Sequence, residues 1–353
     1  MGLTAAVSYD TLSRWGGQEL ITYAMVKALR ELGYAVDVVL LFDGEVDRRM
    51  LDIPARRIKA LFDIDPKIPA RGLTRNIMLG LASLGYDLTI NTVYHVLFWP
   101  FDIGYLNNPG TYMPPFRLKR RIFIEANRLL IGLMGPRLLL TNSKWTLSQL
   151  PFRPRRSGVL YPPIMADRGV CDGVDKEDLV VSIGRIAPDK RTLEVVKAME
   201  AIHDEAPWVK LYVVGLPYRP DYLRQVMAHA RHVEFILDAS EEAKWNYLCR
   251  AKILIHGAVG EHFGLVIAEA QWAGAVPIVH RSGGAWSDIV EYGKFGIGYS
   301  TIEEASKAAV KLLKNTEEWQ TLSKLCRMKS REYSYEAFKG RLTKYLQALG
   351  KAA

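Results

Sequence analysis

The sequence predicts an α/β protein with two doubly wound, Rossmann-like domains that face each other across a cleft. Short apolar segments alternate with amphipathic helical segments in two separate series, as in parallel sheets covered by helices. The chain has 353 residues, a length typical of two domains, and 49% of them are hydrophobic, enough to fill two cores. Ligands of such domains bind at the carboxyl ends of the strands.

The first series begins near the N-terminus with a strand, a loop, a helix and a second strand. We expect the strands at 4–8 and 36–41 and the helix at 19–32. Gly33 directly follows that helix and is the expected C-cap, since glycine adopts the left-handed conformation that ends many helices. Further strands are expected at 88–92, 103–106 and 138–141.

The composition changes at 151–163, where prolines, arginines and a Ser-Gly pair interrupt the alternation. Segments of this composition often mark domain boundaries. We therefore expect a first domain over 1–158 and a second over 159–330.

The second series again alternates strands and helices through short connections, which predicts βαβ units and a parallel sheet. Its expected strands are 179–184, 210–214, 233–237, 252–256 and 276–280. Its expected helices are 191–204, 221–230, 241–250 and 264–272.

The formal net charge of +9 suits nucleic acid, an anionic membrane surface or an anionic small substrate. No nucleic-acid-binding module is recognisable, so we expect no nucleic-acid partner. The densest basic cluster lies in 117–133, where Arg117, Lys119, Arg120 and Arg121 alternate with apolar residues. This pattern fits an amphipathic helix on an anionic membrane surface, and it also fits a solvated helix face.

The sequence contains no run of eighteen apolar residues and no basic leader before the first strand. It therefore predicts neither a spanning helix nor a signal peptide, so that membrane attachment would be peripheral. Three cysteines, Cys171, Cys249 and Cys326, lack metal-ligand spacing. We interpret them as reduced thiols of a cytoplasmic protein.

Two glutamates, Glu261 and Glu269, bracket a glycine and an apolar run. Glu261 falls on a strand-to-helix loop, and Glu269 falls one to two turns into the following helix. Eight helical residues rise about 12 Å, so one carboxylate could reach a sugar and the other a ribose, with a pyrophosphate at the helix start. The same spacing also fits a capped amphipathic helix with two solvated glutamates.

The neighbouring residues extend this pattern into a family motif. His256 precedes Glu261, and Glu261 is the first residue of a Glu-His-Phe-Gly run. A Ser-Gly-Gly run stands at 282–284 after the next strand. Over 180–290 the chain resembles the retaining nucleotide-sugar glycosyltransferases of the GT-B fold, family 4. Its motif is especially similar to the dolichol-pathway α-1,2-mannosyltransferases. The resemblance implies transfer of a hexose, mannose or glucose, from a GDP- or UDP-sugar to a glycan or lipid-linked acceptor, without a cofactor.

The resemblance also implies roles for individual residues. Glu261 would support the transferred sugar, Glu269 would bind the ribose, and a last helix in 331–353 would return to the first domain. The implied nucleotide-sugar contacts further include Gly184, His256, Phe263, Gly264, Leu265, Gly283 and Gly284.

Two bases flank a turn at the end of the first strand of the second series. Gly184 would let the backbone approach a phosphate, and Arg185 and Lys190 lie on either side of the turn. A two-pronged guanidinium and a compact ammonium together suit a diphosphate and would stabilise it as a leaving group. An exposed loop with two solvated bases would look the same, but Arg-x4-Lys matches the family's donor-diphosphate pair.

The first domain offers weaker candidates. Gly16 and Gly17 stand at the first strand-to-helix turn, where they could admit an anion or border the sugar, or simply form a tight turn. The dolichol-type relatives carry Tyr-x-His-x-Pro in this domain, but Asn107 stands here in place of that histidine. Asparagine can bind a hydroxyl but cannot carry a proton near neutral pH. His95 could substitute for it on the acceptor side, or could be a structural histidine.

Other functional classes are less well supported. Asp63 and Asp65 form an Asp-x-Asp pair, but no clear nucleotide-binding strand precedes it, and we expect no metal there. The missing Gly-x-Gly-x-x-Gly motif disfavours a Rossmann oxidoreductase. Two alternatives stay open, an epimerase or phosphorylase on the same fold, and a non-catalytic glycan-binding protein.

Overall fold

The computed structural model describes residues 2–12, 16–44, 52–65, 71–93, 99–108, 125, 129 and 131–352, apart from the side chains of 71–73. His95 lies outside these residues, and so do four bases of the expected membrane helix, Arg117, Lys119, Arg120 and Arg121.

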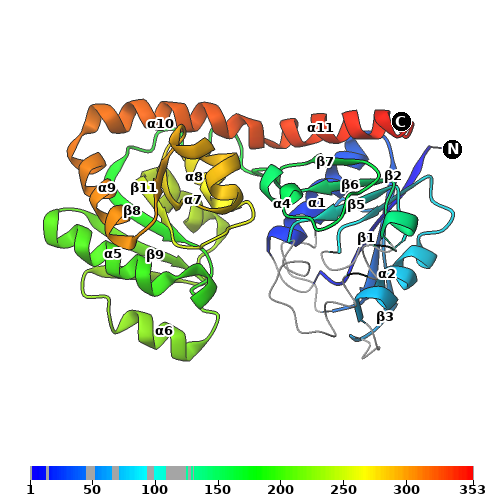
Figure 1. The fold of residues 1–353 in the computed structure, drawn as a ribbon, viewed down its shortest axis with the longest axis horizontal. Coiled ribbons are helices and arrows are strands. Elements are labelled where there is room, and N and C mark those ends of the chain that lie inside the picture. The colour runs from blue at the N-terminus through cyan, green and yellow to red at the C-terminus, as the bar shows by residue number, and fades with distance from the viewer. Residues whose placement is uncertain are drawn as a thin grey trace. The chain divides into compact units, whose positions relative to one another are not determined.

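The chain divides into two compact units (Figure 1). The first comprises Met1–Pro163 together with Tyr335–Ala353, and the second comprises Ile164–Ser334. The first boundary lies beyond 158 because a short strand at Ser157–Val159 still pairs with the first sheet.

The described residues of the first unit form a seven-stranded parallel sheet in the order β3-β2-β1-β4-β5-β6-β7. Its strands are β1 (Thr4–Tyr9), β2 (Ala35–Phe42), β3 (Arg57–Phe62), β4 (Leu88–Asn91), β5 (Ile103–Leu106), β6 (Leu138–Thr141) and β7 (Ser157–Val159). Its helices include α1 (Gly17–Glu31), α2 (Arg71–Ala82), α4 (Lys144–Ser148) and α11 (Tyr335–Ala348). Sequence reasoning missed β3 and β7, because β3 is an exposed edge strand with two bases and β7 has only three residues.

The C-terminal helix α11 packs on the first unit. The Tyr345 hydroxyl accepts a hydrogen bond from the Val159 N–H at 3.0 Å, and Lys339 forms an ion pair with Glu31 on α1 at 2.8 Å. A Cβ atom on Gly158 would lie 2.3 Å from the Tyr345 hydroxyl, so only glycine allows this approach. Residues at opposite ends of the chain thus belong to one unit.

The second unit contains a six-stranded parallel sheet in the order β10-β9-β8-β11-β12-β13. Its strands are β8 (Glu177–Ile183), β9 (Lys210–Gly215), β10 (Val233–Leu237), β11 (Ala251–His256), β12 (Val276–His280) and β13 (Ile297–Tyr299). Its longer helices are α5 (Thr192–Glu205), α6 (Pro220–Met227), α7 (Glu241–Arg250), α8 (Leu265–Ala273), α9 (Ile302–Lys314) and α10 (Thr316–Ser330).

These two parallel sheets with their helices confirm the predicted α/β class. In the second sheet β8 lies next to β11, and the chain returns from β10 across β9 and β8, so the strand order reverses between β8 and β11. A core of buried, mostly aliphatic side chains joins the central strands to α5 and α9. In doubly wound sheets, ligands bind where the strand order reverses, at the carboxyl ends of the strands.

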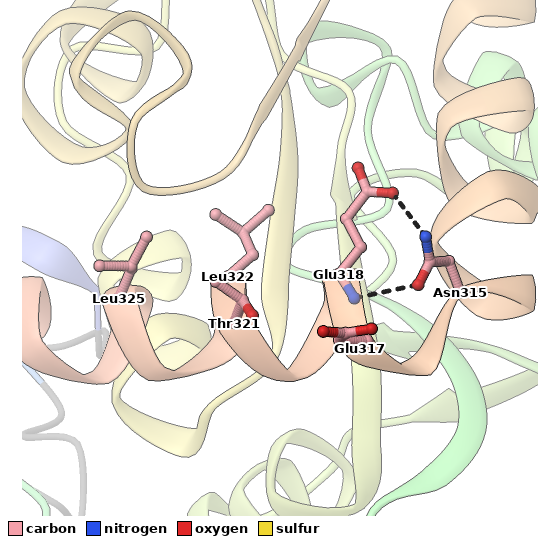
Figure 2. Close-up of a pocket in the computed structure, with 6 residues that line it drawn as sticks. All are labelled: Asn315, Glu317, Glu318, Thr321, Leu322 and Leu325. Carbon is pink, nitrogen blue, oxygen red and sulfur yellow. Dashed lines mark hydrogen bonds between the residues drawn. The ribbon is translucent and has the colours of Figure 1, made fainter.

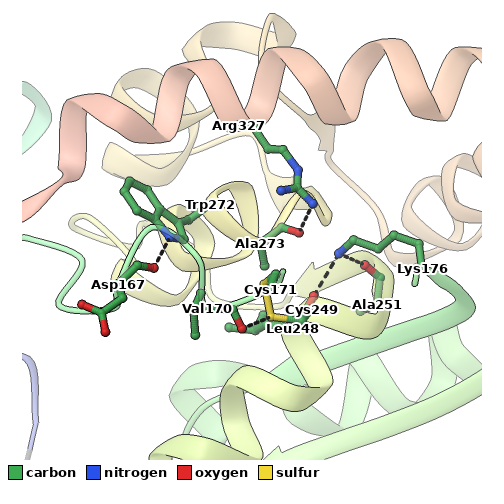
Figure 3. The surroundings of a disulfide bond; sticks show 10 residues. All are labelled: Asp167, Val170, Cys171, Lys176, Leu248, Cys249, Ala251, Trp272, Ala273 and Arg327. Carbon is green, nitrogen blue, oxygen red and sulfur yellow. Dashed lines mark hydrogen bonds between the residues drawn. A yellow bond between two sulfur atoms is a disulfide. The ribbon is translucent and has the colours of Figure 1, made fainter. Parts of the chain in front are cut away.

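The prediction of three reduced cysteines was wrong for two of them. Cys171 and Cys249 form a disulfide with Cα atoms 5.2 Å apart, although 78 residues separate them in the sequence (Figure 3). The segment before β8 lies against α7 and α8, where the Trp272 indole N–H also donates to the Asp167 carbonyl at 3.4 Å. Only this packing brings the two thiols together. Cys326 is free and buried, and burial raises its pKa to about 12.

Among the described residues, no helix combines the length and the apolar character needed to cross a bilayer.

Candidate active site

Three side chains predicted for the site meet at the carboxyl edge of the second sheet. Glu261 lies in the loop between β11 and α8, His256 ends β11, and Lys190 ends the short helix that follows β8. The Lys190 Nζ is 2.5 Å from Glu261 Oε2, and the His256 Nε2 is 3.0 Å from the same oxygen. The cluster therefore joins the two strands between which the strand order reverses.

Glu261 is a buried carboxylate, with 15% of its side chain exposed. Burial raises the pKa of the carboxyl, but the hydrogen bond with His256 and the positive charge of Lys190 outweigh it. The pKa of Glu261 is therefore held well below its ordinary value, and the group is an anion at neutral pH. An ionised carboxylate only accepts, so His256 donates through its Nε2.

Close backbone approach holds this cluster in place. A Cβ atom on Gly257 would lie 2.6 Å from the Lys190 carbonyl oxygen, so glycine is what lets the end of β11 reach the Lys190 turn. The Tyr299 hydroxyl donates to the His256 carbonyl at 2.9 Å. Sequence reasoning missed Gly257 and Tyr299, whose roles depend on contacts between segments that are distant in the sequence.

The Ser-Gly-Gly loop supports the Glu261 backbone. The Gly284 N–H donates to the Glu261 carbonyl at 2.7 Å, and the Gly260 N–H donates to Ser282 Oγ at 2.7 Å. Gly283 has a φ of 74°, and a Cβ atom there would lie 2.3 Å from the Glu261 carbonyl oxygen. The N–H of Gly284 is thus already used within the protein, whereas the sequence suggested that it would contact the donor.

Helix α8 begins immediately after Gly264, which has a left-handed φ of 87°. The N–H groups in the first turn of a helix have no partners within that helix, and they carry the positive end of its dipole. Phe263 is 2% exposed and packs edge-on against Tyr333, so its side chain belongs to the core. The N-terminal end of α8, with its positive dipole, therefore directly follows the loop that carries Glu261.

The second glutamate, Glu269, lies further along α8 and is 5% exposed. Its Oε1 is 2.8 Å from the Nζ of Lys244 on α7, which also forms an ion pair with Glu241 at 2.7 Å. Burial lowers the pKa of Lys244, but the two carboxylates outweigh it and the pKa is raised. The sequence identified Glu269 and missed Lys244, whose only local signal is the Glu-x2-Lys spacing on one helix face.

Arg185 differs from Lys190 in its surroundings. Its side chain is 47% exposed, forms an ion pair with Asp189 at 2.9 Å, and lies over the ring of Tyr218. Gly184 before it has a φ of 146°, and the approach of Gly215 to its carbonyl oxygen leaves no room for a Cβ atom on Gly215. The guanidinium is therefore accessible at the same edge of the sheet.

The candidates of the first unit that the structure describes follow β1 and β5 in the chain. Gly16 is the extended residue before α1, and Gly17 is the first residue of that helix. Asn107 follows β5, and its backbone carbonyl accepts from Asn142 Nδ2 at 2.9 Å. Its side-chain Oδ1 is buried with no hydrogen-bond partner among the described residues.

The Asp-x-Asp pair follows β3, and Asp65 forms an ion pair with Arg75 at 3.2 Å. A separate hollow of about 440 Å³ lies beside α10 and contains none of the predicted site residues (Figure 2). Asn315 and Glu318 in that hollow cap the helix, since the Glu318 N–H donates to Asn315 Oδ1 at 3.0 Å. This hollow therefore lies at the start of α10 and is not part of the candidate active site.

Comparison with solved structures identifies the fold class. Anabaena Alr3699/HepE in complex with UDP has a TM-score of 0.76 at 16% identity, covering 98% of this chain and 100% of that one. Sucrose-phosphate synthase from Thermosynechococcus elongatus has a TM-score of 0.73 at 17% identity, covering 99% and 100%. The chain thus has the GT-B fold of nucleotide-sugar glycosyltransferases.

Residues 169–332 match the family model described as Glycosyl transferases group 1, and the chain therefore carries a glycosyltransferase group 1 domain. Several relatives bear the name GDP-Man:Man(3)GlcNAc(2)-PP-Dol alpha-1,2-mannosyltransferase, among them those from Dictyostelium discoideum and Mus musculus. The one from Dictyostelium discoideum is 27% identical over 60% of this chain and 47% of its own length. The one from Mus musculus is 29% identical over 52% of this chain and 44% of its own length. The Acholeplasma laidlawii alpha-monoglucosyldiacylglycerol synthase is 26% identical over 51% of this chain and 46% of its own length. The chain spans about half the length of these relatives.

Proposed function

We propose that this protein is a retaining glycosyltransferase that moves a hexose, mannose or glucose, from a nucleoside diphosphate sugar to a glycan or lipid-linked acceptor. The observation that carries the proposal is the cluster of Lys190, His256 and Glu261 beside the first turn of α8, the helix that also bears Glu269. It combines cations, the positive end of a helix dipole and an ionised carboxylate, the groups needed to bind a diphosphate and a sugar that becomes cationic.

The donor would be a GDP- or UDP-hexose. The names of the mannosyltransferase relatives contain GDP-Man, and that of the Acholeplasma relative contains a monoglucosyl lipid product. Both support a hexose donor and an acceptor attached to lipid. We favour GDP-mannose as the donor, because the Glu-His-Phe-Gly motif resembles that of the mannosyltransferases.

Arg185 and Lys190 would hold the diphosphate together with the N–H groups at 263–265. Charge-assisted hydrogen bonds to a leaving diphosphate strengthen as its negative charge grows, which lowers the barrier to departure. These cations can neutralise the diphosphate themselves, so we expect no metal cofactor. Glu269 would bind the ribose hydroxyls.

Glu261 would lie beside the transferred sugar and stabilise the positive charge that develops on it. The carboxylate is anionic before the donor binds, because His256 and Lys190 hold its pKa low. A leaving group and an acceptor on the same face of the sugar give retention without a pair of catalytic carboxylates. On the acceptor side we assign Asn107 to a sugar hydroxyl, with its buried Oδ1 able to accept a hydrogen bond.

Attachment to an anionic membrane surface would bring the protein to a lipid-linked acceptor. The range 117–133 also contains two exposed apolar side chains. Leu129 is 69% exposed and Leu133 is 62% exposed. Arg155 donates to the Leu133 carbonyl at 2.7 Å and so places a guanidinium next to Leu133. We propose a cytoplasmic protein that is attached peripherally to the membrane. The expectation of three reduced cysteines no longer supports a reducing compartment, because two of them form a disulfide.

The function is tested by nucleotide binding and net transfer. GDP or UDP should raise the melting temperature of the wild-type protein, and Arg185→Ala/Lys190→Ala should weaken binding at least about tenfold, because charged hydrogen bonds contribute about 1.5–3 kcal/mol each. Arg219→Ala, which removes an exposed base from the start of α6, is the control. Transfer of labelled hexose to a lipid-linked acceptor distinguishes a transferase from an epimerase or phosphorylase. Nucleotide binding without any turnover would favour the non-catalytic alternative.

The membrane proposal has its own test. Sedimentation with vesicles that contain anionic lipid should decrease as salt rises, because charge attraction is screened within about 10 Å at 0.1 M salt. Leu129→Ser/Leu133→Ser and neutralisation of Arg117, Lys119, Arg120 and Arg121 should each reduce binding. Leu81→Ser, an exposed leucine on α2, should not. Equal binding to neutral and anionic vesicles would contradict the proposal.

A further inference from the structure

Glu269 is a buried carboxylate whose charge needs compensation. It is 5% exposed and lies on α8, a helix whose other buried residues are almost all apolar. A buried carboxylate in such surroundings is costly unless a cation lies next to it.

Lys244 supplies that cation from the neighbouring helix α7. Its Nζ is 2.8 Å from Glu269 Oε1, and its own side chain is 17% exposed. A second carboxylate, Glu241, lies 2.7 Å from the same Nζ and is 47% exposed. Lys244 is therefore fixed between an outer and an inner carboxylate, and its position does not depend on Glu269 alone.

We infer that Lys244 is a positioning residue for nucleotide binding. It lies next to the carboxylate as a counter-cation and holds Oε1, which leaves Oε2 for the ribose hydroxyls. The inference rests on the proposed function, because it assigns the ribose contact to Glu269. Lys244 itself makes no contact with the nucleotide and acts through Glu269.

The placement of α7 supports this role. The disulfide joins Cys249 on α7 to Cys171, and the Lys176 Nζ donates to the Leu248 carbonyl at 3.1 Å and to the Ala251 carbonyl at 2.7 Å (Figure 3). The C-terminal end of α7 is thus fixed to the segment before β8. A lysine on a helix held in this way presents its ammonium to Glu269 in a defined place.

The test is calorimetric binding of GDP and UDP, together with steady-state kinetics, on the full chain. Lys244→Met should weaken nucleotide binding and raise the donor KM by about tenfold, with kcat changed less than about threefold, because the ribose contact is present in ground and transition states alike. Lys244→Arg, which keeps the charge, should restore binding to within about threefold of wild type. Glu242→Gln, which changes an exposed glutamate on the same helix, is the control and should have little effect.

A double-mutant cycle separates positioning from general destabilisation. If Lys244 acts through Glu269, Lys244→Met/Glu269→Gln should bind nucleotide no more weakly than Glu269→Gln alone. Losses that add up in the double variant would overturn the inference, and so would a Lys244→Met protein that binds like wild type. A wild-type protein that binds none of these nucleotides would contradict the proposed function itself, a result distinct from either of these.

Discussion

Replacing Glu261 by glutamine tests whether the charge of this buried carboxylate drives turnover. The substitution keeps the size of the side chain and removes its negative charge. It also removes the charge from the contacts with Lys190 at 2.5 Å and with His256 at 3.0 Å. Loss of one preorganised electrostatic group from an active site lowers kcat by about 10²–10³-fold, or about 3–4 kcal/mol. We expect that loss in kcat and a change of less than about threefold in the donor KM.

The pH dependence gives a second measure of the same charge. The folded-state pKa of Glu261 lies well below its ordinary value of 4.5, so the anion persists in the folded protein through mildly acidic pH. The stability contributed by this group is fully present above the ordinary pKa, and it is lost only as pH falls through the folded pKa. Turnover should therefore show no acid limb near pH 4.5 that belongs to Glu261.

The assay is transfer of labelled hexose at saturating and limiting donor between pH 4 and pH 8. Wild type is compared with Glu261→Gln and with Glu317→Gln, an exposed glutamate on α10 that serves as the control. Circular dichroism at each pH excludes unfolding. Two results would refute the reasoning. One is a Glu261→Gln enzyme with near-normal kcat, and the other is a wild-type acid limb near pH 4.5 that disappears in the variant.

Three further predictions concern stability and metal use. Opening the Cys171–Cys249 link by Cys→Ser substitution or by reductant should lower the unfolding free energy of the second unit by up to about 4 kcal/mol, because the link closes a 78-residue separation; an unchanged melting temperature in calorimetry would contradict this. Hydrogen bonds from Arg56 hold the pKa of Asp37 at about 2 instead of 3.8, so its contribution of about 2 kcal/mol should be present above pH 4 and be lost as pH falls through 2. Asp37→Asn should therefore be less stable than wild type at pH 7 and nearly equal to it below pH 2, and a constant difference would argue against ionisation as the cause. Transfer should also survive EDTA, since Arg185, Lys190 and the start of α8 can neutralise a diphosphate; complete loss with rescue by manganese would point to a metal instead.

The sequence alone determined the α/β class and most strands of both sheets, because periodic apolar runs record burial directly. It also identified Lys190, His256 and Glu261, whose residue types and spacing match a family motif. The Cys171–Cys249 link and the Lys244–Glu269 ion pair were decided only by the tertiary structure. Each joins residues from different elements, and the pattern within one segment says nothing about which other segment packs against it. The use of the Gly284 N–H by the Glu261 carbonyl has the same origin, since a hydrogen-bond donor takes its partner from whatever the fold places beside it.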